Sequence, residues 1–125
     1  MRFTVGSIFL LTTLFFAEIT TAHRFAPSIL KMSEISEFEF NVVWKTPAQG
    51  ISGVSLTPVW PESCSILSAS PAQLEGTGVV SQWRLACKFD DNGIVGERIS
   101  VDGLAINQAS VIFMLSLNDG RQYQA

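Results

Sequence analysis

The stretch EFEFNVVWK, residues 37–45, decides the fold class because apolar and polar side chains alternate along it. Four apolar side chains share one face of an extended chain: Phe38, Phe40, Val42 and Trp44. The opposite face carries mainly charged and amide side chains. A period of two is that of a β-strand with one buried face. The stretch therefore predicts a half-buried strand, with these four side chains in the core.

The same period recurs along the chain between short turns rich in Gly, Pro, Asn and Asp. Asn118-Asp119-Gly120 is the best hairpin candidate, and residues 104–109 fit a helical turn or a loop. The expected strands are residues 27–34, 37–45, 53–59, 64–69, 79–87, 96–101 and 109–117, with a short edge at 121–125. About seven short strands in roughly 100 residues predict an all-β fold, an antiparallel, Ig-like β-sandwich.

The first 22 residues have the layout of a secretory signal peptide. Arg2 supplies a positive start, residues 5–17 are apolar and uncharged, and Ala22 ends a small-residue cleavage motif. An apolar run of about 13 residues is shorter than the roughly 20 that a membrane-spanning helix needs. We therefore expect residues 1–22 to be a signal peptide. Residues 23–125 would then form one β-sandwich domain in the periplasm or on the extracytoplasmic face of the membrane.

Cys64 and Cys87 are the two cysteines of the chain. Export would place them in an oxidising compartment, where cysteines pair by default. A bond that closes a loop of about 24 residues is worth about 3 kcal/mol in the loop-entropy account. A two-cysteine metal or redox site is the alternative, but the C-x-x-C spacing and a second histidine are lacking. The sequence therefore predicts a Cys64–Cys87 disulfide.

Charge and motif content exclude several classes of function. Eight basic and eleven acidic residues give a net charge of −3, whereas a nucleic-acid-binding domain needs a basic stripe. No G-x-S-x-G motif or phosphate-binding glycine loop occurs in the chain. The only histidine, His23, lies at the expected mature amino end, where it is poorly placed to activate a nucleophile. We therefore predict a non-enzymatic protein that does not bind nucleic acid.

Carboxylates occur in two groups along the chain. Glu34, Glu37 and Glu39 surround the first strands, and the last two alternate on a polar face, the usual place for solvated charge. The motif Asp-Asp-Asn-Gly at residues 90–93 offers oxygen ligands but lacks the spacing and closing glutamate of a calcium loop. It fits a turn, with a weak cation site as the alternative.

Two residues remain as candidates for binding. Cleavage after Ala22 would leave His23 with a free α-amino group, and the two nitrogens together could chelate Cu(II) or Ni(II). The alternative is that His23 is only the residue that cleavage leaves. Trp60, between Pro58 and Pro61, is the tryptophan that we expect to be most exposed, and it could bind a carbohydrate or a protein.

Six segments carry a family resemblance that covers nearly the whole mature chain. They are AHRFAPSILKMSEI (22–35), FNVVWKTP (40–47), PVWPESC (58–64), WRLAC (83–87), ERISVDGL (97–104) and SVIFMLSLNDGR (110–121). In order and spacing they resemble the extracytoplasmic N-terminal domain of HupE/UreJ-type membrane proteins. The resemblance implies a hydrogenase or urease accessory role, and hence a link to the uptake of nickel or a related metal.

The same resemblance implies a membrane partner. In that family the leading domain precedes a bundle of transmembrane helices with intramembrane histidines and acidic residues, and no such segment occurs here. We therefore expect the domain to act with a membrane protein or with a missing transmembrane domain. Because residues 121–125 come directly after a turn and begin a strand, we also expect a truncated or split gene product.

A second resemblance is to CopC-type periplasmic copper proteins, which are small β-sandwiches that begin at a histidine. It implies a small copper- or nickel-binding module in which His23 is a ligand. The second histidine of that copper site has no counterpart in this chain. This function and a carbohydrate- or protein-binding sandwich are the alternatives to the HupE/UreJ-like role.

Overall fold

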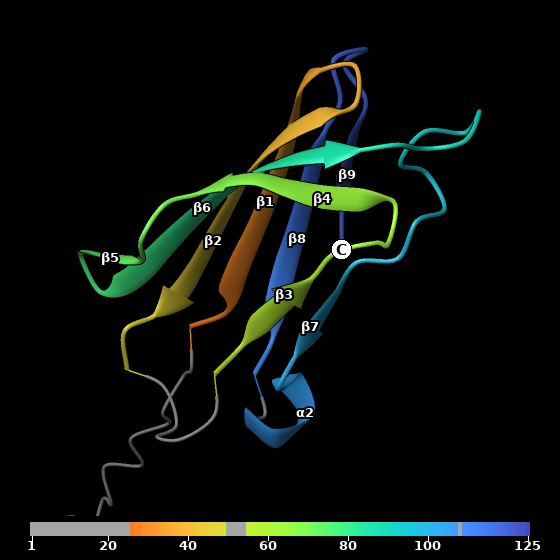
Figure 1. Cartoon of the computed structure of the whole chain (residues 1–125). Helices are drawn as coiled ribbons and strands as arrows, with labels where there is room; N and C mark the ends of the chain where they lie inside the picture. Colours follow the sequence, from red (N-terminus) through yellow and green to blue (C-terminus); the bar gives the residue numbers. More distant parts are fainter. Residues whose placement is uncertain (1–25, 50–54, 108) are drawn as a thin grey trace, which may run out of the picture.

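A computed structural model describes residues 26–49, 55–107 and 109–125, and strands dominate them (Figure 1). The strands are β1 (Ser28–Ser36), β2 (Glu39–Pro47), β3 (Thr57–Val59), β4 (Cys64–Ala69), β5 (Gln73–Glu75), β6 (Gly78–Cys87), β7 (Ser100–Asp102), β8 (Val111–Ser116) and β9 (Gln122–Gln124). The helical turn that the sequence allowed at 104–109 is α2 (Leu104–Asn107). Every expected strand has a counterpart, and β5 is an addition. No helix in the described part of the chain is long and apolar enough to cross a membrane.

The strands form two sheets of very different size. The larger sheet has the order β4-β6-β2-β1-β8-β9, with β5 also paired to β6, and the smaller sheet is the pair β3-β7. The predicted all-β, sandwich-like fold with one disulfide is confirmed. One pair departs from the antiparallel pattern, because β1 and β8 run parallel from Ser28↔Val111 to Ser33↔Ser116. A parallel pair needs a long crossover, and the chain between β1 and β8 supplies it.

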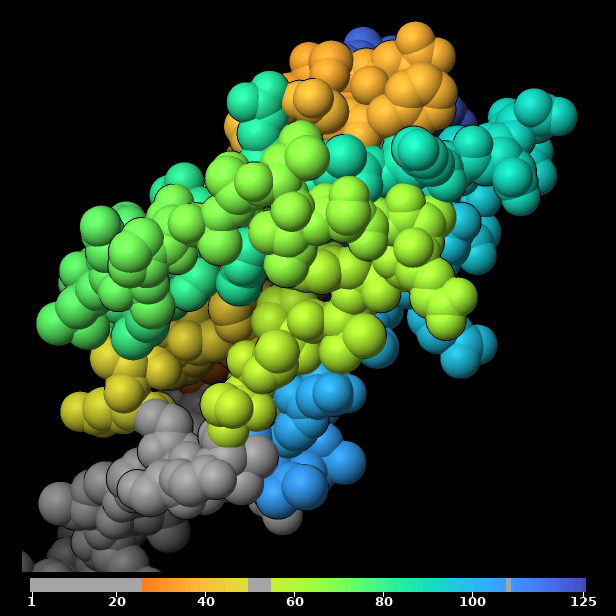
Figure 2. Space-filling view, viewed as in Figure 1, coloured from red at the N-terminus to blue at the C-terminus, as the bar shows by residue number. Residues whose placement is uncertain are grey.

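The core lies on one face of the larger sheet. Its most buried side chains come from its neighbouring strands: Leu30, Met32, Phe40, Val42, Trp44, Leu85, Cys87 and Leu115. The smaller sheet and its flanks cover this face with partly buried apolar residues, among them Leu56, Ile99 and Val101. Seen from that side, β3 and β4 lie in front of β1, and little of β1 is visible (Figure 2). Alternation along each strand therefore gives the two-layer architecture.

Phe38 departs from the predicted core face. It lies in the turn between β1 and β2, has a φ of 69°, and is 47% exposed. Ser36 pairs with Glu39, so only two residues connect the strands, and tight hairpins of this kind require positive φ. The inward side of β2 therefore begins at Phe40, which is buried as predicted, together with Val42 and Trp44.

The predicted disulfide between Cys64 and Cys87 is confirmed, and the structure shows where it lies. The two residues are direct partners in the β4–β6 ladder, with their Cα atoms 3.9 Å apart. The conserved bridge of an immunoglobulin domain joins two different sheets. Here the bond instead joins adjacent strands of the larger sheet, and it ties the edge strand β4 to β6.

Candidate binding cleft at one end of the sandwich

Three connections that are far apart in the sequence meet at one end of the sandwich. They are the β1–β2 turn, the segment 88–99 after β6, and the β8–β9 turn. The tips of the two hairpins lie side by side, and segment 88–99 extends next to them (Figures 1 and 2). Between these connections is a cleft of about 500 Å³. Loops at the end of a rigid sandwich are a common place for binding sites.

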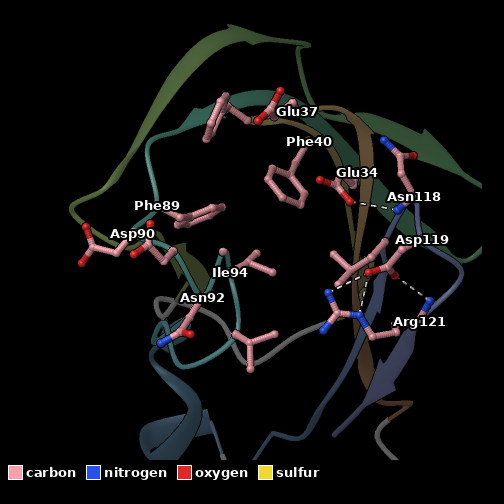
Figure 3. Close-up of a pocket in the computed structure, with 15 residues that line it drawn as sticks. Glu34, Glu37, Phe40, Phe89, Asp90, Asn92, Ile94, Asn118, Asp119 and Arg121 are labelled. Atoms are coloured by element: carbon pink, nitrogen blue, oxygen red, sulfur yellow. Dashed lines mark hydrogen bonds and ion pairs between the residues drawn. The ribbon is translucent and has the colours of Figure 1, made fainter.

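The floor of the cleft is apolar and aromatic. Phe40 from β2 and Phe89 from segment 88–99 pack edge to face, with ring centroids 5.8 Å apart and an interplanar angle of 73°. Ile94, which is 7% exposed, closes the floor from the same segment. In Figure 3 the two rings lie between Asp90 on one side of the cleft and Asp119 on the other. The floor is therefore continuous with the hydrophobic core and is held in place by it.

The rim of the cleft is strongly acidic. Its five carboxylates come from the end of β1 and from all three connections: Glu34, Glu37, Asp90, Asp91 and Asp119. Arg121 is the one cationic residue among the lining residues. The rim therefore has a negative potential, which attracts cationic groups from solution.

Asp119 and Arg121 form an ion pair in the β8–β9 turn, directly before β9. The guanidinium lies 2.7 Å from a carboxylate oxygen, and the backbone N–H of Arg121 donates to the other oxygen at 3.0 Å (Figure 3). The backbone hydrogen bond, with help from the side chain of Arg121, lowers the pKa of Asp119. The same partnership raises the pKa of Arg121. Both groups therefore stay charged, and Arg121 offsets mainly the charge of Asp119 rather than that of the remaining rim.

The position of Phe38 at the edge of the cleft is fixed by its backbone. Its carbonyl oxygen accepts a 2.8 Å hydrogen bond from the N–H of Cys87, the last residue of β6. The ring is half exposed although the backbone conformation is costly for an aromatic residue. An exposed aromatic side chain on a fixed backbone is well suited to contact a partner, because the main chain that carries it is already ordered before binding.

The structure brings together some of the predicted candidates and separates others. Glu34 and Glu37 join Asp90 and Asp91 at the cleft, although they lie far apart in the sequence. Glu39 does not take part, because its carboxylate pairs with Arg84 at 2.6 Å on β6.

The motif at 90–93 is a turn, as its composition indicated. The N–H of Gly93 donates to the carbonyl oxygen of Asp90 at 2.9 Å, and Gly93 has a φ of 62°. Among residues 26–49, 55–107 and 109–125, no group of three or more His, Cys, Asp and Glu side chains is placed to hold a metal ion.

The other candidates lie away from the cleft. Trp60 is half-buried and packs edge to face on Trp83, with ring centroids 5.6 Å apart. Its ring therefore contributes to the core, and only part of it faces solvent. His23, with its α-amino group, lies outside the described residues.

Several lining residues were not among the predicted candidates. Phe89, Ile94, Asn118 and Arg121 come from turns whose composition indicates local geometry but not which other loop they meet. No family model, curated protein or solved structure matches the chain.

Proposed function

We propose that this chain is an exported, non-enzymatic recognition domain that acts with a membrane partner of the HupE/UreJ type. In this proposal residues 1–22 direct export, and residues 23–125 function on the extracytoplasmic or periplasmic side. The cargo of the partner would be nickel or a related metal ion. One support is the resemblance of six sequence segments, in order and spacing, to the HupE/UreJ leading domain. The other is the Cys64–Cys87 disulfide, since disulfides persist in oxidising compartments.

The observation that carries the proposal is the exposure of Phe38 at the acidic cleft. A half-exposed aromatic side chain, on a backbone fixed by a hydrogen bond and next to charged loops, has the composition of a protein-binding surface. Aromatic anchors contribute strongly to interfaces because they bury a large area and lose few rotatable bonds on binding. A partner would therefore contact the end of the sandwich where the three connections meet.

Site-specific crosslinking tests this proposal. A photoreactive phenylalanine analogue would replace Phe38 in the full chain, co-expressed with a HupE/UreJ-type membrane protein that lacks its own leading domain. The matched control carries the analogue at Leu74 on β5, which is 73% exposed and does not line the cleft. We expect a crosslinked product from position 38 and little from position 74. Absence of the product at position 38, or equal yields at both positions, would contradict the proposal.

Export is tested separately. Alkaline phosphatase is active only after it has crossed the inner membrane, so its fusion to the carboxyl end of the full chain should be active. The same fusion without residues 1–22 should be inactive. Equal activity of the two fusions would show that these residues do not direct export.

A further inference from the structure

A second depression opens beside the smaller sheet. Strand β7 pairs with β3, and with no other described strand. Next to β7 is a groove of about 350 Å³ that extends to β8 of the larger sheet. Most of its wall is apolar, and the main contributors are Ile99, Val101, Val111, Phe113 and Leu115. The groove is thus a gap in the second layer of the sandwich, over the core residues Leu30 and Leu115.

The position of this gap, next to the free edge of β7, suits an added strand. Strand β7 is an edge strand, and edge strands offer unpaired N–H and C=O groups to an extended peptide. A strand that pairs with β7 would direct every second side chain toward β8, because side chains alternate between faces. Val111, Phe113 and Leu115 lie at alternate positions on β8 and would receive those side chains. The occupant therefore needs apolar side chains at every second position.

The charge around the groove favours basic residues at one end of the occupant. Ile94 lines both the groove and the acidic cleft, so the two depressions adjoin. At the cleft Arg121 is paired with Asp119, whereas Asp90 and Asp91 are exposed and line the same rim. Glu97 adds a further carboxylate to the groove itself. A segment that leaves the groove toward the cleft would therefore be favoured by Lys or Arg at that end.

We propose that the groove binds an extended segment of the partner protein as a third strand of the β3–β7 sheet. The segment has alternating apolar residues and then one or two basic residues. The inference rests on the proposed function, because it specifies how the partner would be recognised. The occupant is a segment of a partner protein, and the experiment below distinguishes it from a second copy of this chain.

Binding of a synthetic peptide to the mature protein tests the proposal. The probe is a fluorescent nine-residue peptide in which Thr and Val alternate three times before Gly-Lys-Lys. One control has the same composition with the valines and threonines grouped, and a second ends in Gly-Glu-Glu. We expect saturable binding of the probe, at least about tenfold weaker binding of either control, and weaker binding of the probe at high salt. Equal binding of the grouped peptide, or no binding of the probe, would overturn the proposal.

Protein variants locate the binding site. Val101→Glu places a charge in the groove, and Val59→Glu is the matched control, because Val59 is 40% exposed and does not line the groove. We expect binding to be lost in the first variant only, with circular dichroism confirming that both are folded.

Asp90→Asn/Asp91→Asn tests the charge without touching the core, and Glu62→Gln/Glu75→Gln is its control. We expect the first pair to weaken binding about three- to tenfold and the second pair to have no effect.

The two proposals fail in different ways. If the probe does not bind but position 38 still crosslinks to the membrane protein, the strand-addition proposal is wrong and the proposed function is retained. If the probe binds but no crosslink forms, the groove is a peptide site and the proposed partner is wrong. Sedimentation of the mature protein without peptide tests whether a second copy of this chain occupies the groove. A dimer that the Val101→Glu variant abolishes would overturn the partner segment as the occupant.

Discussion

The carboxylate of Glu34 accepts a 2.8 Å hydrogen bond from the backbone N–H of Asn118, across 84 residues of sequence. This contact joins the end of β1 to the β8–β9 turn. It also sets the spacing between two of the three connections that line the cleft (Figure 3). The contact therefore belongs to the fold and to the candidate site at the same time.

Replacing Glu34 separates these two contributions. Glu34→Ala removes the acceptor, so we expect the free energy of unfolding to fall by about 1 kcal/mol and the amide of Asn118 to exchange faster. Glu34→Gln keeps a carbonyl oxygen at the same position, so its free energy of unfolding should fall clearly less. Chemical denaturation and hydrogen exchange measure both effects. Equal losses in the two variants would show that charge, and not the hydrogen bond, is what matters at this position.

The backbone of Phe38 gives a second prediction. A residue with positive φ costs about 1–2 kcal/mol unless it is Gly or, in part, Asn or Asp. Phe38→Asn and Phe38→Ala both remove the aromatic ring, but only Asn tolerates the conformation well. We therefore expect the Asn variant to be more stable than the Ala variant by about 0.5–1 kcal/mol. Thermal denaturation of the two proteins provides the comparison, and a more stable Ala variant would contradict it.

Gly103, between β7 and α2, gives a third prediction. It has a φ of 89°, and a Cβ atom there would lie 2.7 Å from the backbone oxygen of Ser55. Gly103→Ala therefore combines backbone strain with a collision, and we expect a loss of at least about 2 kcal/mol in unfolding free energy. Gly76→Ala is the matched control, since Gly76 has a φ of 60° with nothing within 4 Å of the added Cβ. The Gly76→Ala variant should lose only about 1 kcal/mol of unfolding free energy.

Asp119 gives a prediction about pH. Its pKa is lowered from the usual 3.8 because its carboxylate accepts hydrogen bonds from the backbone and side chain of Arg121. A carboxyl group with a lowered pKa stabilises the folded state fully above the unfolded pKa, and this contribution is lost as the pH falls through the folded pKa. The β8–β9 hairpin should therefore keep this contribution well above pH 3.8 and lose it as the pH falls through 3.8 and then through the lowered pKa of Asp119.

Titration of the Asp119 carboxyl carbon by NMR measures this shift directly. In an Arg121→Gln variant the carboxyl should titrate closer to its usual value, because the guanidinium partner is gone. The backbone N–H of Arg121, the larger cause of the shift, is kept in that variant. We therefore expect a partial return. An unchanged midpoint would mean that the guanidinium contributes nothing.

The alternation of side chains predicts most of the strands because burial on one face leaves a period of two. Leu85 and Cys87 are buried, as the pattern of WRLAC indicates. Asn118-Asp119-Gly120 predicts its hairpin correctly, since the N–H of Gly120 donates to the carbonyl oxygen of Leu117. Local patterns of this kind act within a few residues, which is why they can be read from one sequence.

The same local patterns do not predict which strands pair or which distant turns meet. Nothing in the alternation of β1 indicates that its second neighbour is the parallel strand β8, because a strand's pattern records burial and not which strand lies alongside. The cleft has the same limitation, since Glu34 and Asp91 look like ordinary solvated carboxylates in the sequence. Only the meeting of three turns makes them neighbours.

The position of the disulfide has a consequence for the way in which the edge of the larger sheet is assembled. Cys64 and Cys87 can bond only if β4 has found its correct partner residues on β6, because a slip by one residue turns Cys64 to the opposite face. Oxidation would therefore select one alignment of an exposed edge strand and make it permanent. The irregularity at Ile66/Ser68 lies beyond this covalent anchor and shifts the pairing of the rest of β4 by one residue, so the disulfide fixes the alignment from which that shift starts.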